Sequence, residues 1–170
     1  MRIRILLILL ACCFTGNATA NDNDDTFTLY LVRHAEKQPD GSRDPELTEM
    51  GKNRAVQLGK WLQDKNITDV WSSDYKRTLG TANPLLTELG LEANIYDPGK
   101  LTALAEQLRN NHHNAFVVGH SNTTPELARL LCQCEITDMD ESEYDRLIAI
   151  SVIGEKVHAK TLNQGDLFKP

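Results

Sequence analysis

Short runs of apolar residues alternate along this chain with longer segments in which apolar residues recur every three or four positions. Two of the short runs, Thr28–Val32 and Ala115–Gly119, are rich in β-branched and bulky side chains. Such runs are typical of strands that are buried in a parallel sheet. Ile67–Ser72 has the same character, and Ala93–Tyr96 is a shorter example. The pattern therefore predicts four strands that are separated by the longer segments.

Those longer segments carry the helical repeat. Between Thr48 and Lys65, small or apolar residues recur at spacings of four, three and four, which predicts a helix with Thr48 as its N-cap. Three more helices are expected: over residues 75–89 with Ser73 or Asp74 as N-cap, from Leu101 to about residue 109, and after an N-cap at Thr124.

The C-terminal part differs from the rest. Leu147–Ile153 and Lys156–Leu162 both suit strands, and Gly154 lies between them, so a hairpin is expected. Four strands that alternate with four helices, followed by this hairpin, predict an α/β fold. Its expected architecture is a three-layer α/β/α domain with a mostly parallel central sheet.

The first twenty residues have the form of a signal peptide. Met1–Arg4 is a basic start, Ile5–Phe14 is an apolar run, and Ala18–Ala20 is an A-x-A cleavage site. The apolar run is shorter than the roughly 18 residues that would span a bilayer. We therefore expect export with cleavage after Ala20, most simply to the periplasm. A lipoprotein signal at Cys12 and a retained N-terminal anchor are the alternatives.

Removal of this segment changes the charge balance. It takes away two of the 18 basic side chains and leaves 16 against 24 acidic ones, a formal charge of −8. Nucleic acid is not an expected partner, because binding it requires a basic face. Stable membrane insertion is not expected either. The remaining length suits a disordered stub over residues 21–26 and one domain over residues 27–170. The sequence leaves the oligomeric state open.

Two cysteines remain after cleavage, Cys132 and Cys134, and one residue separates them. In an oxidising compartment they could pair, although a bridge across a single residue is strained. Two cysteines make neither a disulfide framework nor a zinc site. We expect a structural or incidental role, and the sequence leaves their oxidation state open.

Each of the two clearest strands ends on a histidine. Arg33 and His34 follow the first, and His120 follows the second. Arg77 comes just past the end of a third strand, in the first turn of the next helix. Ligands of open α/β sheets bind outside the carboxyl ends of the strands, so these four side chains are expected on one rim.

Two imidazoles and two guanidinium groups on one rim suit a phosphoryl group. Its negative charge is spread over several oxygens, so a catalyst needs fixed positive donors and an in-line nucleophile. Arginine stays charged at any physiological pH. A neutral imidazole can attack phosphorus, and a second imidazole can donate a hydrogen bond to the oxygens.

Three segments, in matching order, resemble motifs of the histidine phosphatase superfamily, the phosphoglycerate mutase-like clan. Leu31–Lys37 is similar to its R-H-G signature, with Ala35 in the place of the usual glycine. Ser72–Ala82 resembles the second motif, which ends in Arg, Thr and Ala on a helix. Val117–Ser121 resembles the late G-H motif. The resemblance implies a phosphoglycerate mutase-like fold.

The same resemblance implies roles for the four rim residues. His34 would be the nucleophile that forms a phosphohistidine, while Arg33, Arg77 and His120 hold the phosphoryl group. Hydrolysis by water would follow, and neither a metal nor another cofactor is implied.

The proton donor is less clearly marked. The acid-phosphatase branch places an acid directly after the second histidine, where this chain has Ser121. The mutase-like branch places one between the second arginine and the second histidine, so Asp97, at a strand end, is the preferred candidate. Glu36 and Glu126 are alternatives on rim loops. Small phosphohistidine phosphatases of the clan need no strong acid, because imidazole is already a good leaving group.

Substrate specificity carries no readable motif. The candidate substrate-binding residues outside the rim quartet are Lys37, Arg43, Asn122 and Thr123. The loop Gln38–Leu47 and the region after Cys134 would set specificity. Glu135–Asp145 carries six acids and is expected to be a solvated loop, with metal binding as the alternative.

Together these observations predict a metal-independent phosphomonoester hydrolase that acts on a small-molecule or glycolipid phosphoester. One alternative is a weakly active or inactive protein that binds phosphate or a phosphosugar. Another is a phosphohistidine phosphatase.

Overall fold

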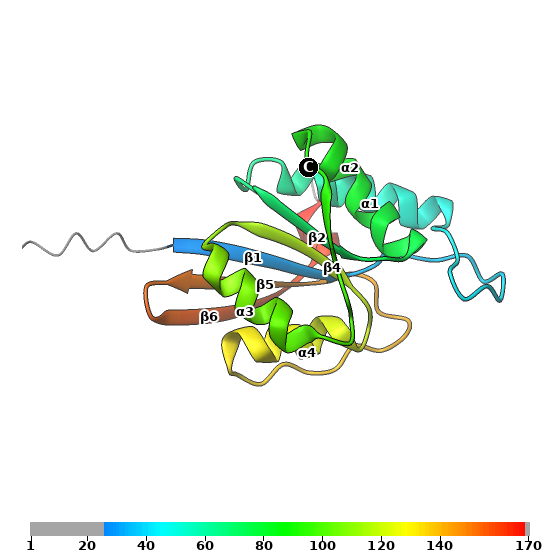
Figure 1. The fold of residues 1–170 in the computed structure, drawn as a ribbon. Coiled ribbons are helices and arrows are strands. Elements are labelled where there is room, and N and C mark those ends of the chain that lie inside the picture. The colour runs from blue at the N-terminus through cyan, green and yellow to red at the C-terminus, as the bar shows by residue number, and fades with distance from the viewer. Residues whose placement is uncertain (1–25, 169–170) are drawn as a thin grey trace, which may run out of the picture.

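A six-stranded sheet forms the centre of the computed structural model, which describes residues 26–168 (Figure 1). The elements in chain order are β1 (Thr26–Arg33), α1 (Glu49–Leu62), β2 (Asp69–Ser73), α2 (Lys76–Leu89), β3 (Ala93–Tyr96), α3 (Leu101–Asn111), β4 (Ala115–Gly119), α4 (Thr123–Cys132), β5 (Arg146–Ile153), β6 (Lys156–Asn163) and α5 (Gln164–Leu167). The predicted signal peptide lies outside the described residues. Thr26, the last residue of the predicted stub, is the first residue of β1.

The strands lie in the order β3-β2-β4-β1-β5-β6. The first four are parallel, and β5 and β6 are antiparallel to their neighbours. The predicted α/β class and terminal hairpin are therefore confirmed. In the centre of the sheet, Arg33 at the end of β1 lies beside Gly119 at the end of β4. This register brings the residues that follow the two strands to one edge.

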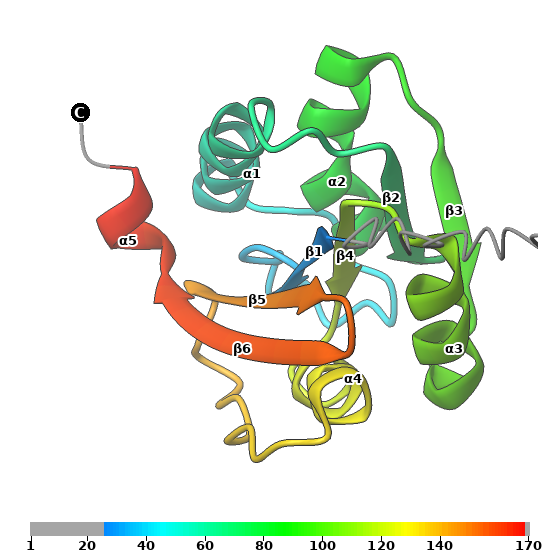
Figure 2. The same ribbon diagram turned by 90° about the vertical axis from the view of Figure 1, so that its left-hand side faces the viewer.

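Apolar side chains on the central strands alternate between two cores. Leu31 and Val117 face the core that α3 and α4 cover, whereas Val32 and Val118 face the core that α1 and α2 cover. Figure 2 shows the two pairs of helices on opposite sides of the sheet. Burial on both faces explains why these strands appear as continuous apolar runs in the sequence.

The start of one helix agrees with the sequence and two others do not. The Thr48 hydroxyl accepts a hydrogen bond from the Gly51 N–H at 3.1 Å, as an N-cap does. However, α2 follows Tyr75 rather than Ser73 or Asp74, with no side-chain cap. Likewise α4 follows Asn122, because the Thr124 hydroxyl donates instead to the carbonyl oxygen of Val32.

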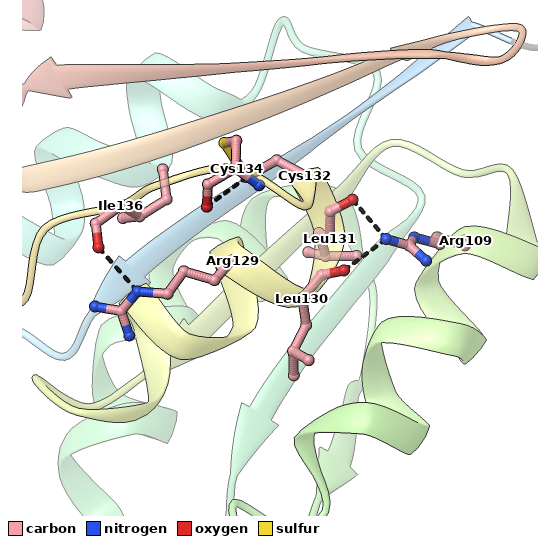
Figure 3. Close-up of a disulfide and its surroundings, with 7 residues drawn as sticks. All are labelled: Arg109, Arg129, Leu130, Leu131, Cys132, Cys134 and Ile136. Carbon is pink, nitrogen blue, oxygen red and sulfur yellow. Dashed lines mark hydrogen bonds between the residues drawn. A yellow bond between two sulfur atoms is a disulfide. The ribbon is translucent and has the colours of Figure 1, made fainter.

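A disulfide joins Cys132 and Cys134 where α4 ends (Figure 3). On one side of it, the Arg109 guanidinium on α3 donates to the last carbonyls of α4. On the other, the Arg129 Nε–H donates to the Ile136 carbonyl at 2.9 Å. These bonds fix the direction in which the chain leaves α4 towards β5.

Between residues 26 and 168, no helix combines the length and apolar character needed to cross a membrane.

Candidate active site

The site begins where β1 and β4 end side by side. The His34 N–H donates to the Gly119 carbonyl at 3.0 Å, so the sheet ladder continues one residue past β1. The connection after β1 and the connection between α4 and β5 lie at this same end of the sheet (Figure 1). The residues that can cover the site therefore come from these two connections.

The imidazole rings of His34 and His120 meet edge to face, with their centroids 5.5 Å apart. His34 is almost completely buried, and His120 is partly exposed. The fold thus brings the two histidines that the sequence predicted for one rim within reach of a single small anion.

Hydrogen bonding fixes the tautomer of His34. Its Nδ1 lies 2.8 Å from the Ala35 carbonyl oxygen, which can only accept, so Nδ1 carries the proton and donates. Burial, together with the charges of Arg33, His120 and Arg77, lowers the pKa of His34 to about 3. The ring is neutral at physiological pH, and the lone pair of Nε2 is available as a nucleophile.

His120 is held from two sides. Its Nε2 lies 2.9 Å from the Ser73 hydroxyl, which itself donates to Thr78, so Nε2–H is the donor. The Arg77 Nη2 lies 3.5 Å from Nδ1 on the other side of the ring. Burial and the positive charges of Arg77 and Arg33 lower the pKa of His120 to about 4.

Arg33 is the more deeply buried guanidinium of the pair. Its Nη1 donates to three carbonyl oxygens, those of Asp140, Glu141 and Glu143, and its Nη2 donates to the Glu141 carboxylate at 2.9 Å. The Tyr144 ring packs over it at 4.3 Å. The connection between α4 and β5 therefore wraps around Arg33 and fixes its position.

Arg77 is held by the connection that follows β1. The Asp44 carboxylate lies 3.6 Å from the Nη1 of Arg77. The same Nη1 donates to the Arg43 carbonyl at 3.4 Å. The guanidinium carbon of Arg77 lies 4.4 Å from the centre of the Tyr75 ring. The Nε atoms of Arg33 and Arg77 are both buried, and neither has a hydrogen-bond partner among the described residues. Each thus offers a donor that an anion could use.

A hollow of about 360 Å³ lies beside His120. Its lining residues are Tyr75, Arg77, Pro98, Gly99, His120, Asn122 and Thr123. A larger hollow of about 550 Å³ between α1 and α2 contains none of the rim histidines or arginines. The smaller hollow is the candidate substrate site, because of the two it alone is lined by rim residues, Arg77 and His120.

The predicted acids lie in other bonds. The Asp97 carboxylate accepts the Gly99 N–H at 2.9 Å and pairs with Lys100 at 3.6 Å, so it stabilises its own turn. Glu126 pairs with Arg129.

Glu36 is held in a different way, by the Arg54 guanidinium on α1. Two nitrogens of Arg54 bind its carboxylate. Burial alone would raise the pKa of Glu36, but the bonds from Arg54 outweigh it and lower that pKa. The carboxylate therefore stays charged and fastens the segment after His34 to α1.

The predicted substrate-binding residues fall into two groups. Asn122 and Thr123 line the hollow, and the Thr123 hydroxyl also accepts the His120 N–H at 2.9 Å. Lys37 forms an isolated β-bridge with Leu47, which closes the base of the loop after β1. Arg43 is exposed, and its carbonyl contacts Arg77.

The acidic segment Glu135–Asp145 is a largely exposed loop, as predicted, but one of its acids also contacts the site. Glu141 lies on the site: its carboxylate binds both Arg33 and the hydroxyl of Ser121. No local pattern distinguishes this residue from its acidic neighbours, because the contact joins positions 108 residues apart. Within residues 26–168, no cluster of three or more His, Cys, Asp or Glu side chains could hold a metal ion.

Comparison with known families matches residues 29–98 to the histidine phosphatase superfamily, branch 1. Among curated relatives, a "probable phosphatase" of Schizosaccharomyces pombe is 40% identical over 76 residues, which cover 41% of this chain and 27% of the relative. A "probable phosphoglycerate mutase", GpmB of Erwinia tasmaniensis, is 37% identical over 76 residues, 41% of this chain and 35% of the relative. The chain thus matches about a third of the length of these relatives.

Solved structures share the fold over more of the chain. The protein histidine phosphatase SixA, complexed with tungstate, superposes with a TM-score of 0.69 at 20% identity, over 83% of this chain and 99% of the other. A mycobacterial glucosyl-3-phosphoglycerate phosphatase gives a TM-score of 0.65 at 14% identity, over 81% and 99%. These similarities establish a histidine phosphatase-like fold.

Proposed function

We propose that this chain, whose residues 29–98 match the histidine phosphatase superfamily, hydrolyses phosphomonoesters through a phosphohistidine on His34. The observation that carries the proposal is the meeting of the His34 and His120 rings at 5.5 Å, with the buried guanidinium group of Arg33 and the partly buried one of Arg77 at the same end of the sheet. This is the charge and the nucleophile that phosphoryl transfer requires.

In the first step, the lone pair of His34 Nε2 attacks phosphorus and the bond between phosphorus and the ester oxygen breaks. The alcohol leaves with one proton. The hydrogen bond from Nδ1 to the Ala35 carbonyl stabilises the positive charge that develops on the ring. In the second step, water attacks the phosphohistidine, and inorganic phosphate leaves His34 neutral again.

Positive charge around the phosphoryl group stabilises both steps. The unpartnered Nε–H groups of Arg33 and Arg77 would donate to its oxygens. A dianion beside His120 also opposes the two arginine charges that lower the pKa of this ring, so His120 gains a proton more readily and donates as well. This set needs no metal to neutralise the transferred group.

Hydrolysis is preferred over mutase activity because of which proteins share the fold. The solved phosphatase structures superpose over more than four fifths of this chain, whereas the mutase relative matches 76 residues of it. Small phosphoesters are the proposed substrates, because the hollow beside His120 is about 360 Å³.

We also propose that the protein acts after export to the periplasm. The disulfide between Cys132 and Cys134 supports this, because disulfides persist in oxidising compartments. Alkylation of thiols in intact cells tests the proposal: we expect both cysteines to be protected until a reductant is added. Two free thiols in the mature protein would contradict it.

The enzymatic proposal is tested by release of inorganic phosphate from 4-nitrophenyl phosphate, measured with a chelator present. The unaltered protein and the control His158→Ala, on exposed β6, should be equally active. His34→Ala should lose activity by at least about 10³-fold, because it removes the nucleophile. Quenching in alkaline detergent should trap a phosphoenzyme that is stable in alkali and labile in acid, except in His34→Ala. Equal rates for His34→Ala and the unaltered protein would refute the mechanism, and binding without turnover would favour the phosphate-binding alternative.

A further inference from the structure

Glu141 places a carboxylate among the groups that bind the phosphoryl group. Its Oε2 lies 2.9 Å from Arg33 Nη2, and its Oε1 accepts a hydrogen bond from the hydroxyl of Ser121, the residue after His120. Most of the Glu141 side chain is nevertheless exposed, at 77%. The carboxylate of this residue therefore reaches Arg33, while the rest of its side chain is exposed to solvent.

A second hollow lies beside Glu141. It measures about 300 Å³ and is lined by Ser121, Asn122, Asp138, Met139 and Glu141. Asn122 also lines the hollow beside His120, so the two hollows are neighbours. A substrate that extends past Asn122 would therefore meet Glu141.

The other candidate acids are engaged elsewhere. Asp97 is bound within its own turn, Glu36 is held by two nitrogens of Arg54, and Glu126 pairs with Arg129. Glu141 is also bound, but its partners are a phosphate-binding arginine and the neighbour of His120. A phosphoryl group that accepts from the Nε–H of Arg33 would share the charge of this guanidinium with Glu141 and so weaken the hold on its carboxylate.

We propose that Glu141 carries the proton to and from the ester oxygen. The assignment rests on the phosphatase function proposed above. In this chain the acid comes from the connection between α4 and β5, and Ser121 holds it at the position where it acts.

The proton balance closes over one cycle. A phosphomonoester loses its second proton with a pKa of about 6, so part of it binds as the monoanion. That proton passes to the Glu141 carboxylate, and the ester then carries two negative charges. His34 attacks phosphorus, and Glu141 gives the proton to the departing ester oxygen, which leaves as the alcohol. Glu141, again charged, takes a proton from the attacking water, and this proton leaves with the inorganic phosphate.

The charge around Glu141 sets when it can hold a proton. In the free site, the hydrogen bond from Ser121 and the charges of Arg33, His34 and Lys37 lower the pKa of Glu141. The charged or titratable groups that face it are Arg33, His34, Lys37, His120 and Asp138. A phosphoryl dianion beside Glu141 adds two like charges and weakens the bond to Arg33, and both changes raise this pKa.

The test compares two leaving groups in the Glu141→Gln variant. For glycerol 2-phosphate, whose alkoxide is a poor leaving group, kcat/KM should fall by about 10²- to 10⁴-fold. For 4-nitrophenyl phosphate, whose phenolate leaves without a proton, it should fall by less than about 5-fold. The unaltered enzyme should lose activity on glycerol 2-phosphate above about pH 6, and Glu141→Gln should lack this decline.

Two further variants keep the comparison specific. Glu135→Gln changes an exposed residue of the same connection that lines neither hollow, and should not change the ratio of the two kcat/KM values. Asp97→Asn should not change it either. Equal losses of Glu141→Gln on both substrates would show that Glu141 only positions Arg33, and a changed ratio in Asp97→Asn would move the role to Asp97. Either result overturns the assignment. If the unaltered protein fails to hydrolyse either substrate, the phosphatase function fails first and the assignment with it.

Discussion

The Thr81 hydroxyl links the turn after β1 to α2: it accepts the Ala35 N–H at 2.9 Å and donates to the Arg77 carbonyl at 2.7 Å. Thr81 is buried. One of its partners, Ala35, is adjacent to His34, and the other, Arg77, is one of the proposed phosphate-binding residues. A single hydroxyl therefore links the backbone next to His34 to the backbone of Arg77.

Replacing Thr81 tests this link. Thr81→Val leaves the Ala35 N–H buried without a partner, which should lower the free energy of unfolding by about 1–3 kcal/mol. Activity should fall more than stability suggests, by about 10²-fold, because a displacement of 1 Å at a reacting group is that costly. Thr81→Ser keeps the hydroxyl and should retain most of the activity. Urea unfolding and kcat/KM measure the two effects, and identical behaviour of both variants would show that the hydroxyl has no such role.

The backbone before His120 is tightly enclosed. A Cβ atom at Gly119 would lie 2.9 Å from each of three hydroxyl oxygens, those of Thr123, Thr124 and Tyr96. Each hydroxyl is already hydrogen-bonded to the backbone nearby, so none can move without losing that hydrogen bond.

Gly119→Ala should therefore cost about 1–3 kcal/mol of stability and displace His120, with at least about a 10-fold loss of kcat. Gly80→Ala is the matched control, because its Cβ would meet only the side chain of Leu47, at 3.3 Å, and the change favours the helix. Thermal unfolding and steady-state kinetics distinguish the two variants. A Gly119→Ala protein as active as Gly80→Ala would show that the three hydroxyls do leave room for a Cβ atom at this position.

The disulfide should matter little for stability. It closes a loop of only a few residues, so its removal by replacing Cys132 and Cys134 with serine should cost no more than about 1–2 kcal/mol. The hydrogen bonds from Arg109 and Arg129 still fix the chain on either side (Figure 3). Activity should therefore stay within about twofold. A large loss of activity without a loss of stability would show that the bridge positions Glu141 further along the connection.

The sequence predicts the elements of this fold well because their signals are local. The runs around Val32 and Val118 are buried on both faces, and burial of that kind leaves a continuous apolar pattern. The edge where the strands end follows from their parallel arrangement. The position of His34 and His120 on one edge could therefore be expected before any coordinates were known.

The caps of α2 and α4 and the contact of Glu141 with Arg33 could not be predicted in this way. Ser73 and Thr124 both have the chemistry of an N-cap, but the fold offers their hydroxyls better partners, His120 and the Val32 carbonyl. The contact between Glu141 and Arg33 depends on how a long connection returns across the sheet. Local pattern contains no information on that path, so one acid among six could not be singled out.

The two active-site histidines should also make the fold sensitive to acid. Their pKa values in the folded protein, about 3 for His34 and about 4 for His120, lie below the value of about 6.5 expected in the unfolded chain. Between these values the unfolded state binds more protons, so stability rises with pH in that range. The contribution is fully present above about pH 6.5 and is lost as the pH falls towards 4.

From pH 6.5 to 4.5 the two histidines together should lower the free energy of unfolding by about 2–4 kcal/mol, with the partial exposure of His120 reducing its share. Urea unfolding at both pH values measures the change. His34→Gln should lose roughly half of this pH dependence, since glutamine does not titrate, whereas His158→Gln on β6 should keep all of it. Carboxylates add a dependence of the same sign, but they are common to the three proteins and cancel in the comparison. Parallel pH profiles for His34→Gln and the unaltered protein would mean that burial does not hold His34 neutral. The ring would then lack the free lone pair that the proposed mechanism requires.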